Sequence, residues 1–296
     1  YKRQVRTALL ILVPLLLILP CALGYGFINL LTGTGCGGEI NPDVIGLAYE
    51  DASFRSSEFG RDIPAYWIPA SPGDLTVIVV PTGGAAARGD RMSEIEVYHR
   101  AGVNVLTFSA RGCIGTVNNS LGYLEVDAVG DALTYLQSRS DINRNQIGLH
   151  GFSAGGATVI MAAARFAEDV AWAVSEGGYH DFPAQIEQNA PYALPFGMGL
   201  LFRVGAHIGY RVTIGHDMSV LSPVSVIDEI ESPVLLIYGT LEPGLEGARE
   251  MARVGGENVE LWEVEGATHG NYIVVAPQEY EQRIKDFLTT QNTENA

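Results

Sequence analysis

The sequence is poor in basic residues, and this scarcity excludes one class of partner. Its 18 lysines and arginines are outnumbered by 34 aspartates and glutamates, which gives a formal net charge of -16. Binding to nucleic acid requires a dense basic surface that replaces the counterions of the phosphates. We therefore expect no nucleic-acid partner.

Cysteine is also scarce in this chain. The 3 cysteines, Cys21, Cys36 and Cys113, have neither the CxxC spacing of a metal or redox site nor the density of a disulfide scaffold. A bridge between Cys36 and Cys113 would require an oxidising compartment. We expect unpaired thiols at these two positions, and neither a metal nor another cofactor.

Hydrophobic residues and glycine are plentiful enough for a folded domain. Of 296 residues, 47% are hydrophobic and 35 are glycine, as is typical of compact, turn-rich α/β proteins. A single α/β domain often reaches this length. We expect one domain over residues 44–290, followed by a short tail at 291–296.

The N-terminal segment has the composition of a membrane anchor. Residues 7–31 carry no charge and follow a short basic segment, and they are numerous enough to cross a hydrocarbon core of about 30 Å as a tilted helix. A single-pass anchor is predicted at 1–31, joined to the domain by a Gly-rich linker at 32–43. Because the next basic residue is Arg55, the positive-inside rule places the domain outside the cytoplasm.

A cleaved signal peptide is the alternative interpretation of this segment. Ala22-Leu23-Gly24 offers a small-x-small cleavage site after an apolar stretch, and the protein would then be secreted. Apolar character continues past this site through Leu30 and Leu31, which favours a retained anchor.

From Val44 onward, strand-like and helix-like segments alternate, a pattern typical of a mostly parallel sheet with helices on both faces. Residues 179–226 interrupt this alternation and are too many for a simple crossover. We expect them to form a helical lid over the site. The predicted strands are 47–54, 63–68, 75–80, 103–109, 146–149, 171–175, 234–238 and 259–264, and the predicted helices are 91–101, 123–139, 155–167, 245–254 and 278–289.

A Gly-x-Ser-x-Gly motif lies between one of these strands and an Ala-rich helix. It consists of Gly151, Phe152, Ser153, Ala154 and Gly155. In this context the motif forms a nucleophile elbow, in which the glycines leave room for a tight turn and the serine is exposed above the sheet. The N–H groups of the helix N-terminus favour negative charge there. The motif predicts Ser153 as a nucleophile.

A serine hydroxyl needs a positioned base, and after an elbow of this kind the histidine comes last along the chain. Of the 6 histidines, His269 lies just past the last predicted strand, in the loop 266–270. The others fall in a predicted helix, beside the elbow or in the insertion, where we expect structural roles. His269 is therefore the predicted general base.

Together these segments resemble the α/β-hydrolase superfamily of serine hydrolases over residues 44–288. The resemblance is strongest to its membrane-anchored members of the Bem46 and ABHD13/ABHD17 groups. Segments 48–54 and 66–70 are similar to the opening strands of those proteins, and Arg111-Gly112 is similar to their Asp-Tyr-Arg-Gly motif. The resemblance implies an α/β-hydrolase fold that acts without a cofactor.

The resemblance also implies the acid that orients the histidine. The family usually has aspartate three residues after the glycine at position 239, where this chain has Glu242. Glutamate can also accept the histidine Nδ1–H. Glu176 and Glu246 are the alternatives.

The oxyanion hole is implied in the same way. Thr82-Gly83-Gly84 stands where the family has His-Gly-Asn. Because backbone N–H groups form such a hole, the side-chain differences do not remove it. The resemblance implies Gly84 and Ala154 as the donors.

These residues predict hydrolysis of an ester or thioester through an acyl-enzyme formed on Ser153. The apolar middle of the insertion favours apolar or acyl substrates, and packing of the lid against the domain explains it equally well. An amidase or peptidase with the same triad stays open, as does an inactive membrane-anchored binding module. Apart from the membrane, no obligate partner is expected.

Overall fold

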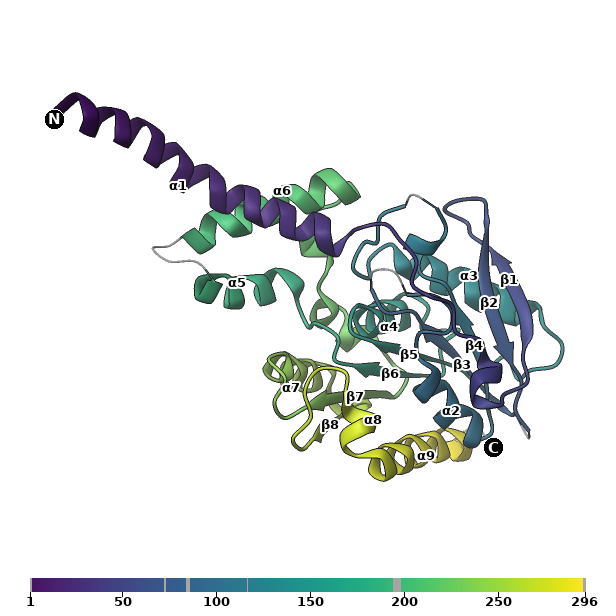
Figure 1. The fold of residues 1–296 in the computed structure, drawn as a ribbon. Coiled ribbons are helices and arrows are strands. Elements are labelled where there is room, and N and C mark those ends of the chain that lie inside the picture. Colours follow the sequence, from purple (N-terminus) through teal and green to yellow (C-terminus); the bar gives the residue numbers. More distant parts are fainter. Residues whose placement is uncertain (1, 72, 84–85, 116, 194–197, 295–296) are drawn as a thin grey trace.

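The structure is a computed structural model that describes residues 2–71, 73–83, 86–115, 117–193 and 198–294. At 2–3, 5–15, 189–193 and 291–294 it describes the backbone alone. A sheet covered by helices forms the main body, and an arm projects from it (Figure 1). The arm consists of α1 (Lys2–Leu31), α5 (Phe182–Ala193) and α6 (Met198–Ile214).

The sheet has eight strands in the order β1-β2-β4-β3-β5-β6-β7-β8. β2 is antiparallel to β1 and β4, and the other neighbours are parallel. The inner strands are continuous apolar runs because both of their faces are buried. The predicted mostly parallel α/β fold is therefore confirmed. The strands are β1 (Glu50–Arg55), β2 (Asp62–Ile68), β3 (Leu75–Val80), β4 (Val103–Phe108), β5 (Ile147–Phe152), β6 (Trp172–Glu176), β7 (Val234–Gly239) and β8 (Val259–Val264).

Helices cover both faces of the sheet and enclose two cores. Residues of α3, α4 and α7 pack on one face, and residues of α2 and α9 pack on the other. The last helix ends at Glu294, so it extends into the segment predicted as a tail. The helices are α2 (Met92–Arg100), α3 (Glu125–Ser138), α4 (Ala154–Arg165), α7 (Leu245–Gly255), α8 (Tyr272–Val275) and α9 (Pro277–Glu294), with 3₁₀ turns at Pro42–Ile45, Arg111–Cys113, Met218–Val220, Pro223–Ser225, Ile227–Glu229 and Gly256–Asn258.

The arm joins the N-terminal helix to the predicted insertion. α5 and α6 lie between β6 and β7 in the chain, and α6 runs alongside α1 (Figure 1). The backbones of α1 and α6 touch: a Cβ added at Gly24 would overlap the carbonyl oxygen of Phe202, and one added at Gly205 would overlap that of Cys21. Glycine, which has no Cβ, permits this close approach.

The segment predicted as a linker is tied to the domain. Cys36 and Cys113 form a disulfide, with their Cα atoms 4.5 Å apart, so the expectation of unpaired thiols is wrong. Glu39 forms an ion pair with Arg88 nearby. The two cysteines are 77 residues apart, and only the path of residues 32–43 over the body brings them together.

In the part of the chain that the structure describes, no helix is long and apolar enough to cross a bilayer. In the predicted anchor at 1–31, the side chains of residues 1–3 and 5–15 lie outside that description. The anchor therefore stays a prediction.

Candidate active site

Ser153 lies at the sharp turn between β5 and α4. Its backbone has φ 56° and ψ −122°, a region that residues with a side chain seldom adopt. Two glycines make the turn possible: a Cβ at Gly155 would lie 2.7 Å from the carbonyl oxygen of Pro81, and one at Gly151 would overlap the carbonyl oxygen of Gly155. This is the nucleophile-elbow geometry, with the serine at the mouth of a cavity.

Three side chains from separate loops meet at this turn. Nε2 of His269 lies 3.1 Å from Oγ of Ser153, and its Nδ1 lies 2.7 Å from Oε1 of Glu242. Glu242 follows β7 and His269 follows β8, so both lie at the carboxyl edge of the sheet beside the elbow. The imidazole thus bridges the hydroxyl and the carboxylate.

The carboxylate of Glu242 is itself held in place. Its side chain is only 4% exposed, whereas that of His269 is 47% exposed. Tyr272 donates its hydroxyl to Oε2 at 2.6 Å, and the backbone N–H of Gly239 donates to the same oxygen at 3.2 Å. Sequence reasoning missed Tyr272, although its position three residues after His269 is a signal, since residues so spaced can lie on one turn.

The two alternative acids lie elsewhere. Glu246 pairs with Arg249 at 2.5 Å, and its side chain is 82% exposed. Glu176 is fully buried, accepts a hydrogen bond from Tyr280, and has Arg91 at 3.7 Å. Of the three glutamates, it is therefore Glu242 that lies beside the histidine in the structure.

A buried polar cluster lies beneath the elbow. Burial and the nearby Glu94 raise the pKa of Glu176 to about 8, against the opposing charge of Arg91. Burial, with the same arginine, lowers the pKa of His150 to about 3. Arg91 also lies over the ring of Phe152, 4.4 Å from its centroid. Because that ring is 4.7 Å from the ring of His269, the cluster supports the site from below.

Of the two predicted oxyanion donors, the structure describes Ala154 but not Gly84. Ala154 begins α4 directly after the serine, so its N–H is among the unpaired donors of a helix N-terminus. Gly84 lies outside the described residues. Its neighbours Thr82 and Gly83 line the cavity.

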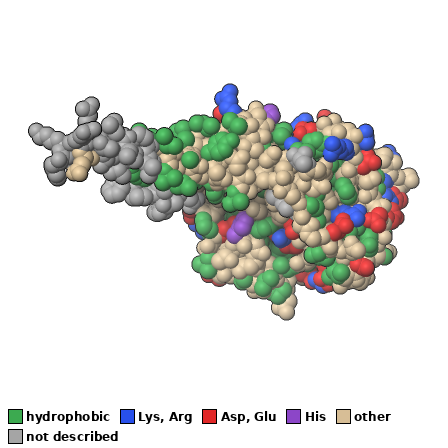
Figure 2. Space-filling view, turned by 45° about the horizontal axis from the view of Figure 1, so that its top comes forward, with side chains coloured by type: hydrophobic (Ala, Val, Ile, Leu, Met, Phe, Trp, Pro, Cys, Tyr) green, Lys and Arg blue, Asp and Glu red, His purple; other side chains and the backbone are tan. Residues whose placement is uncertain are grey.

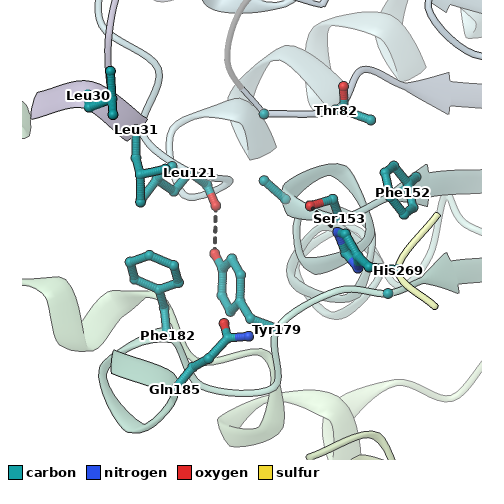
Figure 3. A pocket seen from close by; sticks show the side chains of 13 residues that line it. Leu30, Leu31, Thr82, Leu121, Phe152, Ser153, Tyr179, Phe182, Gln185 and His269 are labelled. Atoms are coloured by element: carbon teal, nitrogen blue, oxygen red, sulfur yellow. Dashed lines mark hydrogen bonds between the residues drawn. The ribbon is translucent and has the colours of Figure 1, made fainter. Parts of the chain in front are cut away.

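The cavity beside the serine is large enough for a small-molecule substrate. Its volume is about 530 Å³, within the usual range of about 300–1,000 Å³ for such sites. In Figure 3, Ser153 and His269 lie on one side, and Leu31, Leu121 and Phe182 lie on the other. The cavity is lined by Leu30, Leu31, Thr82, Gly83, Leu121, Phe152, Ser153, Ala154, Gly177, Tyr179, Phe182, Gln185 and His269.

Metal ligands do not gather at this site. Among the described residues, no group of three or more His, Cys, Asp and Glu side chains is placed to hold an ion.

Comparison with known families identifies the fold and the kind of chemistry. The model of the prolyl oligopeptidase family, Peptidase_S9, matches residues 92–291, which include the elbow and the histidine loop. The chain belongs to the prolyl oligopeptidase family. As a member of this family it is a serine hydrolase, which favours an enzyme over an inactive binding module.

The chain is also similar to individual proteins, one by sequence and others by structure. An uncharacterized Bacillus subtilis protein, YqkD, is 28% identical over 188 residues, 62% of this chain and 60% of that protein. An esterase from Pyrococcus furiosus is similar in structure, with a TM-score of 0.69 and 20% identity over 88% of this chain and 97% of its own. A puromycin-hydrolyzing peptidase from Mycobacterium tuberculosis has a TM-score of 0.61 and 18% identity, over 85% and 41% of the two chains. At these identities the structural neighbours show the fold alone.

Proposed function

We propose that this serine hydrolase cleaves carboxylic esters or thioesters of apolar acyl compounds through a Ser153-His269-Glu242 triad. The observation that carries the proposal is the continuous line of contacts from Oγ of Ser153 through both imidazole nitrogens to the carboxylate of Glu242. In this line the carboxylate fixes the tautomer with hydrogen on Nδ1, which leaves Nε2 free to accept a proton.

The reaction proceeds in two halves. Oγ of Ser153 attacks the acyl carbon as its proton passes to Nε2 of His269, and the imidazolium is stabilised by Glu242. The same proton then moves to the departing alcohol or thiol, which leaves an ester on the serine. Water, deprotonated by the histidine, releases the acid and restores the hydroxyl.

The negative oxygen formed at each attack needs hydrogen-bond donors. The N–H of Ala154 is one donor in the proposal, and the N–H of Gly84 is the other, as the family resemblance implies. Loss of one such donor typically lowers the rate about 10²- to 10³-fold.

An amidase or peptidase activity is the second candidate, because the family is that of the prolyl oligopeptidases. The same three side chains serve both reactions. The esterase proposal is supported by the apolar side of the cavity and by the fold shared with the Pyrococcus furiosus enzyme.

The proposal includes attachment to a membrane through residues 1–31, with the catalytic domain outside the cytoplasm. It is supported by the uncharged run at 7–31 and by exposed apolar side chains on both long helices of the arm, gathered over it in Figure 2. The Cys36–Cys113 disulfide supports the placement, because disulfides persist in oxidising compartments. These exposed side chains are Leu16, Leu17, Ile18, Leu19, Leu23, Phe27 and Leu30 on α1, and Leu200, Val204, Ile208 and Val212 on α6.

A fluorophosphonate probe tests the triad directly. The purified wild-type chain is expected to become labelled, whereas Ser153→Ala and His269→Ala lose labelling and about 10⁴- to 10⁶-fold of the hydrolysis rate, because the nucleophile or its base is gone. Ser140→Ala, an exposed serine outside the cavity lining, serves as a control for purification and folding. A folded wild type that neither binds the probe nor cleaves any substrate contradicts the proposal.

A substrate panel then separates the two candidate activities. Ester, thioester and aminoacyl-amide substrates of matched acyl groups are compared by kcat/KM. Higher values for the esters and thioesters are expected. Preferred cleavage of the amides would favour the peptidase.

A further inference from the structure

We infer that the last turn of α1 forms one wall of the substrate pocket, so that the N-terminal helix is part of the active enzyme. The inference rests on the proposed function, and it assigns Leu31 as a residue that determines specificity for the apolar chain of the ester. Leu30 and Leu31 both line the cavity that contains Ser153 and His269.

The chemistry of this wall indicates what it contacts. Leu31 packs with Phe182 against a buried cluster that includes Leu121 and Tyr179. In Figure 3 these apolar side chains face Ser153 across the cavity, and the hydroxyl of Tyr179 is turned away to the carbonyl oxygen of Leu121, at 2.7 Å. A wall without a free charge favours a hydrocarbon chain of several carbons, since each buried methylene adds to binding.

The turn that carries Leu31 is firmly held. Ile28 is fully buried, and Thr32 is fully buried and donates its hydroxyl to the carbonyl oxygen of Ile28 at 2.8 Å. The side-chain amide of Asn118 donates to the carbonyl oxygen of Thr32 at 2.9 Å. The disulfide at Cys36 fixes the chain just beyond this turn. Leu31 is therefore held in the wall from both sides.

The same helix holds the lid. α6 touches the backbone of α1 at Gly24 and Gly205, and Thr213 donates to the side chain of Asn29 at 3.0 Å. Tyr210, also on α6, donates to the carbonyl oxygen of Ser120, one residue before Leu121, at 2.8 Å. α1 and α6 thus form a single unit whose base borders the pocket, and removal of α1 would take away both the wall and the support of the lid.

The test uses the full-length chain in detergent with two substrate series. The first varies the acyl chain of p-nitrophenyl esters from acetate to laurate, and the second varies the alcohol of butyrate esters from ethyl to octyl. Leu31→Ala opens the wall, and Leu31→Trp fills the pocket. In at least one series, the chain length with the highest kcat/KM is expected to rise in the first variant and to fall in the second, with a change of about tenfold in the ratio of long to short esters.

If the preferred chain length shifts in opposite directions in the two variants, Leu31 forms a wall of the pocket. General damage to the fold would change the profiles of both variants in the same direction. Leu23→Ala and Leu23→Trp are the matched controls: Leu23 is on the same helix, 48% exposed and outside the cavity lining. If Leu31→Trp does not fold, the smaller substitution Leu31→Phe is used in its place. An unchanged chain-length profile in both series overturns the inference while leaving the triad intact. A wild type that cleaves no ester and resists the fluorophosphonate probe overturns the proposed function itself.

Discussion

The body and the arm of this molecule are built by different means, and they contribute different parts of the site. In the body, parallel strands hold Ser153, Glu242 and His269 in loops at one edge of the sheet. In the arm, two helices pack through glycines and present Leu31 to the cavity. The body, whose strands are joined by hydrogen bonds, thus supplies the reactive groups. The arm, whose helices are held by side-chain packing, supplies the apolar wall of the cavity.

The interiors of the two regions differ as well. Beneath the elbow, Glu94, Arg91, Glu176 and His150 form a buried polar cluster. In the core of the arm, the buried hydroxyls of Tyr179, Tyr210 and Thr32 are uncharged and donate to backbone carbonyl groups. The stability of the body should therefore depend on pH, whereas that of the arm should depend on how well its side chains pack.

The largest expected effect is a difference in kcat between substitutions of two buried glutamates of the body. Glu242→Gln should lower kcat by about 10³- to 10⁴-fold, because the imidazolium loses its stabilising charge. Glu176→Gln should change kcat less than about tenfold, since Glu176, whose pKa is raised to about 8, is mostly protonated at neutral pH and glutamine resembles it. Steady-state kinetics on one short ester checks both variants. Equal losses would mean that the acid has been assigned wrongly.

A smaller effect is expected where the two helices of the arm touch. Gly24→Ala places a methyl group against the carbonyl oxygen of Phe202 and should destabilise the arm by about 1–3 kcal/mol. Gly26→Ala is the matched control on the same helix, because a Cβ there meets nothing within 4 Å and should be neutral or slightly stabilising. Thermal melting and limited proteolysis of α1 measure the difference. Identical behaviour of the two variants would show that the contact does not hold the arm.

The third effect concerns the pH dependence of the body. His150 has a folded pKa of about 3, below its ordinary value of 6.5, so near pH 5 the unfolded chain binds a proton that the folded chain does not. Its contribution to stability is therefore present above pH 6.5 and is lost as the pH falls, by about 2 kcal/mol between pH 7 and pH 5.

Urea unfolding at both pH values checks this effect. His150→Gln should lose about 2 kcal/mol less than the wild type between them. Glu176, whose pKa is raised, has the opposite dependence and is present in both proteins, so it cancels in the comparison. If His150→Gln loses as much stability between pH 7 and pH 5 as the wild type, another group causes the acid sensitivity.

The predicted strands agree with the structure because buried parallel strands leave an unmistakable pattern of short apolar runs. Ser153 and His269 were identifiable for a related reason, since each follows a predicted strand in a glycine-rich turn. The structure brings them to within hydrogen-bonding distance. Local pattern was thus sufficient to locate both side chains.

Other parts of the site depend on contacts that local pattern does not encode. Glu176 and Glu242 both lie at strand ends on the same edge of the sheet, and the contact of Glu242 with His269, which Glu176 lacks, distinguishes them. The cavity wall at Leu31 and the disulfide at Cys36 join segments far apart in the chain. Periodicity within 1–31 gives no sign of either contact.

The disulfide at Cys36 has one more consequence, for a chain that has been cut. A protease that cleaves between Gly37 and Asp43 breaks the polypeptide on the far side of the bridge from α1, yet the sulfur–sulfur bond to Cys113 still joins the two pieces. The clipped protein would therefore migrate as one species without a reductant and as two with it. With the proposed membrane anchor, release of the catalytic domain by a cut in this segment would require reduction as well as proteolysis.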